Sequence, residues 1–230
     1  MNETKREVTM PLPGAFCWTR FGAEAGQDFE AILARKEQER RQNGGVFLWG
    51  IGNNVAPSLP SLFERVRRPM LAFSPIKSRA QAHDESPDQI AVWTRATGAN
   101  GEPFQIPSGS MVMSRYTPGK TRHYALVCQS QQPLRSLASP EWVSIGALRN
   151  VKTGNPVGSS QVTAVVSIDP AREESGAIYP IAFHCELAAP YVLKLEAPLV
   201  ISDVAMAERE WSKYRASKWA EAPQQLRLAV

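Results

Sequence analysis

The sequence is poor in cysteine and has no long apolar run. Its three cysteines, Cys17, Cys128 and Cys185, are odd in number and widely spaced, which argues against a disulfide scaffold. We therefore expect free thiols and a reducing, cytoplasmic location. No apolar stretch approaches the ~20 residues that span a bilayer, and residues 1–14 lack the apolar core of a secretory signal. The sequence predicts no membrane association.

Histidine is equally scarce, at three residues, His83, His123 and His184, and neither CxxC nor HxxxH spacing occurs. No metal site and no cofactor are therefore expected. A cysteine nucleophile would need a histidine from a distant strand, for example Cys128 with His184. The favoured role of the cysteines is instead that of small buried core residues.

Complete nucleotide-binding loops are also missing. The stretch "GIGNNV" begins at Gly50 and has Val55 where a dinucleotide loop needs its third glycine. The stretch "TPGKTRHY" has a Gly-Lys-Thr, but Ser114 replaces the first glycine of a phosphate loop, and a strand pattern follows. Gly50 and Gly52 then have two interpretations, a backbone approach to a flat ligand beside Trp49 or a strand bulge.

What the sequence does contain is ordinary globular composition with a mild basic excess. Its 230 residues suffice for one large domain or two small ones, and 43% are hydrophobic. The net charge is +4. This balance is compatible with a polyanionic partner and equally with an ordinary solvated surface.

Periodicity predicts an α+β protein. A strand is expected over 15–20, a helix within 24–45, a strand over 46–49 and a short helix over 59–67. The first helix places Phe29, Ile32, Leu33 and the aliphatic stem of Lys36 on its apolar face. Its charged groups are expected on the other face, namely those of Glu30, Lys36, Glu37, Glu39, Arg40 and Arg41.

From residue 70 onward the pattern becomes one of short strands separated by Pro, Gly and Ser, until a helix over 202–222 closes the chain. The predicted fold is a curled mixed or antiparallel, barrel-like sheet with an early crossover helix and a C-terminal helix.

Phe16 and Trp18 in the first strand, a helix with a charged face, a glycine turn and an apolar strand ending in Trp49 form a characteristic order. This order resembles the opening of the PUA-like superfamily and is most similar to its EVE, ASCH and YTH domains. The strands within 114–128 and 161–169 would be further walls of such a barrel. The resemblance covers 15–55 and, more loosely, 111–168, and implies one PUA-like domain over 1–230 with a C-terminal helical extension.

The resemblance implies a nucleic-acid partner, because members of this superfamily hold RNA or an extruded, modified DNA base in an aromatic-lined pocket. A flipped base needs aromatic faces, a polar edge and cations for the flanking phosphates. The expected base-binding residues are Trp18, Trp49, Asn53, Asn54, Ser159, Ser160 and Gln161, with Trp93 as a further aromatic candidate. The expected phosphate-binding residues are Arg65, Arg67, Arg68, Arg115, Lys120 and Arg122.

The leading hypothesis is a protein that binds DNA or RNA and reads a base, in a modification or restriction setting. Each set of residues also has a structural interpretation, since tryptophans at strand ends are usually core residues and "RVRR" is typical of a solvated helix end.

Two other classes of function stay open. The first is a small enzyme that tailors a base or nucleotide. In "FHCEL", His184 and Glu186 point to one face of a strand and Cys185 to the other, so His184, Glu186 and either Cys128 or Cys185 are its catalytic candidates. The second is an accessory subunit that binds a protein partner through Trp211 and Trp219 of the C-terminal helix.

Overall fold

The structure is a computed structural model that describes residues 13–21, 29–52, 55–75, 90–106, 113–115, 123–134, 141–158, 161–172 and 176–201. Several predicted features lie outside these residues: the C-terminal helix over 202–222, Asn53, Asn54, Lys120, Arg122, Ser159 and Ser160.

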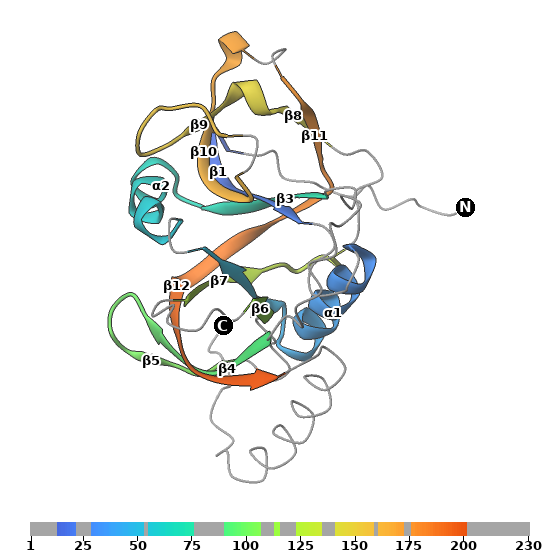
Figure 1. Cartoon of the computed structure of the whole chain (residues 1–230), viewed down its shortest axis with the longest axis vertical. Helices are drawn as coiled ribbons and strands as arrows, with labels where there is room; N and C mark the ends of the chain where they lie inside the picture. The colour runs from blue at the N-terminus through green and yellow to red at the C-terminus, as the bar shows by residue number, and fades with distance from the viewer. Residues whose placement is uncertain are drawn as a thin grey trace, which may run out of the picture.

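One large mixed sheet organises the chain (Figure 1). Its strands follow the order β2 (Val46–Ile51), β7 (His123–Gln129), β12 (Phe183–Ile201), β3 (Met70–Pro75), β1 (Ala15–Phe21), β10 (Thr163–Ile168) and β9 (Leu148–Asn150). Strand β4 (Ile90–Gly98) pairs with β12 and with the short strands β5 (Pro103–Phe104) and β6 (Met113–Arg115). Strands β8 (Glu141–Ser144) and β11 (Ile178–Ile181) form a separate two-stranded ribbon.

Two α-helices accompany the sheet, α1 (Phe29–Gln42) and α2 (Leu59–Arg65), together with the 3₁₀ turns η1 (Ala56–Ser58), η2 (Ile145–Ala147) and η3 (Pro170–Arg172). The predicted mixture of helix and strand is confirmed, and so is a mixed sheet, because β1 and β3 run parallel while the other described pairs are antiparallel. The barrel-like closure is not formed, since the path of described strands ends openly at β2 and β9. None of the described helices is long and apolar enough to cross a bilayer.

Strand β12 bends, and its two ends pair with different strands of the sheet. Its first residues pair with β3, and its later ones pair with β7 and β4. The register with β7 shifts between Leu187 and Val192, and Tyr191 between them has a positive φ of 65°. Such an irregularity bends a strand. The ring of Tyr191 packs against Phe63 of α2, with ring centroids 4.6 Å apart, so the bend is held by the second helix.

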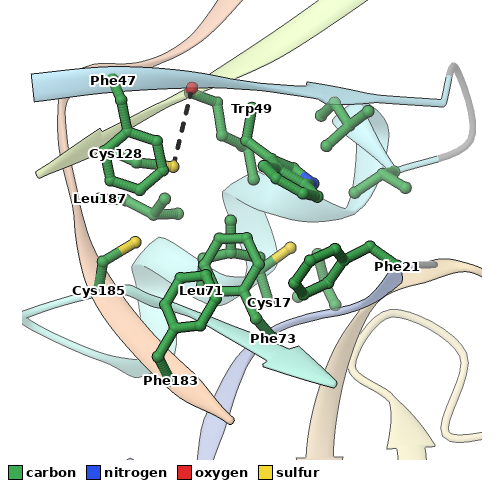
Figure 2. Packing of buried hydrophobic residues seen from close by; sticks show 14 of the residues in the cluster. Cys17, Phe21, Phe47, Trp49, Leu71, Phe73, Cys128, Phe183, Cys185 and Leu187 are labelled. Atoms are coloured by element: carbon green, nitrogen blue, oxygen red, sulfur yellow. Dashed lines mark hydrogen bonds between the residues drawn. The ribbon is translucent and has the colours of Figure 1, made fainter. Parts of the chain in front are cut away.

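The buried side chains form three clusters, which strand alternation separates. The central cluster contains Cys17 and Phe21 of β1, and its Phe73 and Phe183 rings stack with centroids 4.1 Å apart (Figure 2). The ribbon cluster lies between the sheet and the β8–β11 ribbon; its largest members are Phe16, Trp18, Met70, Leu148 and Ile181. The β4 cluster contains Leu48, Trp93, Ala96, Ala125, Val127, Leu193 and Leu195.

Helix α1 covers the open edge of β2 with charged side chains. The Lys36 Nζ and Glu39 Oε2 atoms are 2.8 Å apart and buried. Glu39 Oε1 accepts a hydrogen bond from the backbone N–H of Leu48 at 2.6 Å, and Lys36 Nζ donates to the Leu48 carbonyl. The pair thus satisfies backbone groups that an edge strand would otherwise present unpaired.

The expected apolar face of α1 is confirmed at Ile32 and Leu33, which are buried. The expectation that the charged ends of Lys36 and Glu39 lie on the outer, solvent-facing side with the other charges is wrong. The reason is that β2 offers unpaired backbone groups, and a lysine–glutamate pair can bond both of them.

Candidate functional site

Trp18 lies entirely inside the ribbon cluster. Its indole Nε1 donates a hydrogen bond to Ser74 Oγ at 2.8 Å, and its ring is 5.7 Å from that of Tyr179. The polar edge of this tryptophan is therefore already bonded, and its faces are covered by neighbouring side chains.

Trp49 lies in the central cluster, where 9% of its surface is exposed. Its ring meets Phe73 edge-on, with centroids 4.8 Å apart (Figure 2). Phe73 and Ser74 are consecutive on β3 and point to opposite faces, so Trp49 and Trp18 lie on opposite sides of this part of the sheet. Trp93 belongs to the β4 cluster. The structure does not bring these three tryptophans together around one pocket.

The three cysteines converge in the central cluster although they are far apart in sequence (Figure 2). All three are free and buried, which confirms their expected role as small core residues. Burial raises the pKa values of the Cys17 and Cys128 thiols, so both remain protonated at neutral pH. Cys128 Sγ donates weakly to the Leu126 carbonyl at 3.9 Å. A protonated thiol without access to solvent is a poor nucleophile.

His184 and Glu186 share the face of β12 that is opposite to Cys185, so the structure does not bring His184 to the thiols. Burial lowers the pKa of His184, and the nearby Glu141 carboxylate partly opposes this shift. The Glu186 carboxylate forms an ion pair with Arg68. Glu186 is thus paired with Arg68 rather than with His184, and both Glu186 and His184 point away from the buried thiols.

Gln161 helps to hold a buried arginine that the sequence analysis missed. Arg20 is 7% exposed; its Nε donates to the Gln161 carbonyl at 3.0 Å and its Nη1 to the Tyr179 hydroxyl at 2.9 Å. Its guanidinium carbon is 5.2 Å from the Tyr179 ring centroid and 5.7 Å from that of Trp18. The sequence pattern could have indicated that Arg20 is buried, because Arg20 follows Phe16 and Trp18 at alternate positions of the same strand.

Helix α2 lies next to the turn that follows β9 (Figure 1), and exposed basic residues are found on both segments. Arg65 Nη2 donates to the Val151 carbonyl at 3.3 Å, which places the end of the helix beside the exposed Lys152. Arg67 and Arg68 follow in the connection to β3, and both are exposed. We call Arg65, Arg67, Arg68 and Lys152 the α2 basic surface. The sequence did not predict the position of Lys152, because its proximity to the end of α2 depends on a contact between segments that are far apart in the chain.

The remaining predicted phosphate-binding residues are not part of this surface as described. Arg115 is the last residue of β6, where its backbone pairs with Ile90, and Lys120 and Arg122 lie outside the described residues. No group of three or more His, Cys, Asp or Glu side chains in the described part of the chain is arranged to hold a metal ion. Comparison with protein-family models, with curated proteins and with solved structures gave no match.

Proposed function

We propose that the protein binds nucleic acid and that the phosphates of the bound strand lie on the α2 basic surface. The observation that carries this proposal is the hydrogen bond from Arg65 to the Val151 carbonyl, which brings the exposed segment 65–68 to the turn that holds Lys152, a residue more than eighty positions away in the chain. Phosphate contacts supply most of the sequence-independent affinity for nucleic acid. The resemblance to PUA-like domains supports the same class of partner.

The charges of this surface are available to a ligand. Among the ion pairs between described residues, none involves Arg65, Arg67 or Lys152. Arg68 is the exception because it pairs with Glu186, and it remains 62% exposed. An exposed cation without a carboxylate partner exchanges its counter-ions for a phosphate at little cost.

Recognition of a base would require an aromatic residue other than Trp18 or Trp49. Both side chains are enclosed by the core, and stacking requires an accessible ring face. Phosphate binding on the α2 basic surface does not depend on either tryptophan.

The test is the affinity for fluorescently labelled DNA and RNA, single-stranded and duplex, measured at two salt concentrations. Three to four phosphate contacts give a slope of about −2 to −3.6 in log affinity against log salt, so binding should weaken by roughly 20- to 150-fold between 50 and 200 mM salt. Absence of binding at 50 mM salt, or binding that does not change with salt, would contradict the proposal.

A further inference from the structure

A carboxylate of the central sheet is bonded to one cation of the α2 basic surface. Arg68 Nη2 forms an ion pair with Glu186 Oε1 of β12, and the two side chains are 62% and 33% exposed. The ion pairs between described residues include none with Arg65, Arg67 or Lys152. The four cations therefore differ, because only Arg68 has a carboxylate partner within the described part of the chain.

The sheet fixes the backbone on both sides of this ion pair. The Leu187 N–H donates to the Pro69 carbonyl at 2.8 Å, and Glu186 lies directly opposite Met70 in the antiparallel register of β12 and β3. Arg68 also precedes a proline, which disfavours helical backbone angles at this position. The carboxylate and the guanidinium thus stay within reach of each other whether or not a ligand is bound.

The surroundings of Glu186 leave its charge to Arg68. The residues directly opposite Glu186 on the two neighbouring strands are Met70 of β3 and Gln129 of β7, and both are uncharged. His184 lies two residues earlier on the same face of β12, and burial lowers its pKa, so it adds no charge at neutral pH. Arg68 is therefore the cation that the carboxylate neutralises.

We infer that Glu186 competes with phosphate for Arg68 and so limits the α2 basic surface to three phosphate contacts, at Arg65, Arg67 and Lys152. The inference rests on the proposed function, because it concerns the same surface and the same ligand. Carboxylates and phosphates bind the same guanidinium donors. A nucleic-acid strand can use Arg68 only if it displaces Glu186 or lies beside its charge, and either cost offsets the contribution of the contact.

The experiment measures how the affinity for a single-stranded oligothymidine of about ten nucleotides depends on salt. Each phosphate contact with a single strand contributes about 0.7 to the magnitude of the slope of log affinity against log salt. The wild type should therefore give a slope of about −2.1, and Glu186→Gln a slope of about −2.8. Because this difference accumulates below 1 M salt, Glu186→Gln should bind about 8-fold more tightly at 50 mM and about 3-fold more tightly at 200 mM.

Replacement of Arg68 in two backgrounds shows when this arginine contacts phosphate. In the wild-type background Arg68→Gln leaves the Glu186 charge uncompensated, so binding should weaken while the slope stays near −2.1. In the Glu186→Gln background the same substitution should bring the slope from about −2.8 back to about −2.1.

The matched control for these variants is Glu64→Gln. Glu64 is an exposed carboxylate of α2 that forms no ion pair with a described residue. Its replacement removes a negative charge near the same surface without releasing a cation. The slope of Glu64→Gln should therefore equal that of the wild type.

The outcomes separate failure of this inference from failure of the proposed function. Three results would overturn the inference alone: equal slopes in the wild type and Glu186→Gln, a slope shallower by about 0.7 when only Arg68 is replaced, or equal steepening in Glu64→Gln and Glu186→Gln. Absence of binding at 50 mM salt in both the wild type and Glu186→Gln would remove the inference and the proposed function together. Thermal unfolding checks that each variant is folded, and the exposed Arg68→Gln keeps the test decisive if Glu186→Gln is destabilised.

Discussion

Charged residues follow one another in α1 and again at the end of α2, but they have different roles in the two places. In α1 the charges are part of the structure, because Lys36 and Glu39 bond the backbone of β2. In α2 the contact with the core is apolar, through the fully buried Leu59 and Leu62, and the cations at its end face solvent. A run of charged residues in a sequence can therefore either stabilise the fold through buried hydrogen bonds or form an exposed surface that is available to a partner.

Glu37 and Arg40 of α1 form hydrogen bonds with the chain segment that follows β7. Glu37 accepts hydrogen bonds from Arg40 Nε at 2.7 Å and from the backbone N–H of Leu134 at 2.8 Å. Arg40 Nη1 donates to the Ser130 carbonyl at 3.2 Å. The charged face of α1 thus holds residues 130–134 as well as β2. Four predictions test this comparison of the two helices.

The largest effect is expected at Lys36. Lys36→Met leaves the Glu39 carboxylate buried without its counter-ion and removes a donor from the Leu48 carbonyl. Breaking a buried ion pair on one side costs about 3–5 kcal/mol of unfolding free energy. Urea unfolding measures this cost, with the exposed Lys152→Met as a matched control that should stay within about 0.5 kcal/mol. Equal stability of the two variants would show that the α1 charges are not structural.

A somewhat smaller loss of stability is expected when a buried apolar side chain of α2 is truncated. Leu62→Ala removes a fully buried side chain from the central cluster and should lower the unfolding free energy by about 2–4 kcal/mol. The same measurement applies, and the folded fraction should still bind nucleic acid, because the cations of α2 remain. A loss below about 1 kcal/mol would mean that α2 is not held by this contact.

An intermediate, pH-dependent effect is expected at Glu37. Hydrogen bonds from Arg40, with those from the Leu134 backbone and Arg41, lower the pKa of Glu37 from 4.5 to about 2. Because the folded pKa lies below the unfolded one, this stabilisation is fully present above about pH 5 and is lost as the pH falls towards 2. The stability difference between wild type and Glu37→Gln should therefore shrink on acidification. A difference that stays constant from pH 6 to pH 2.5 would contradict this role.

The smallest effect on stability is expected at Arg67. Its side chain is exposed and forms no ion pair with a described residue, so Arg67→Gln should change the unfolding free energy by less than about 0.5 kcal/mol. Arg40→Gln is the matched substitution on α1 and should cost about 1.5–3 kcal/mol, because it loses charged hydrogen bonds to Glu37 and Ser130. Thermal melts of the two variants compare the helices directly.

Much of the local structure was predictable from sequence patterns. The strand expected over 15–20 is observed as Ala15–Phe21, the strand over 46–49 as Val46–Ile51, and the helix over 59–67 as Leu59–Arg65. These elements follow from short-range periodicity, which needs no knowledge of the partners. The burial of the cysteines was predictable for the same reason, since all three fall within apolar strands.

The parts that depend on distant partners were not predictable. Whether Trp18 and Trp49 share a pocket depends on which face of β3 each of them meets. The inward turn of Glu39 depends on β2 being an edge strand, a property of the sheet order. Periodicity alone assigns every charged residue of a helix to solvent, and so it cannot separate Glu39 from Arg41.

The most direct test of the account is the salt dependence of single-strand binding by three proteins. These are the wild type, the double variant Arg65→Gln/Arg67→Gln, and the control Arg41→Gln, which removes an exposed charge from α1. Loss of two phosphate contacts should reduce the slope of log affinity against log salt by about 1.4 in the double variant, and the control should keep the wild-type slope. Identical slopes in all three proteins would show that the α2 basic surface does not contact phosphates.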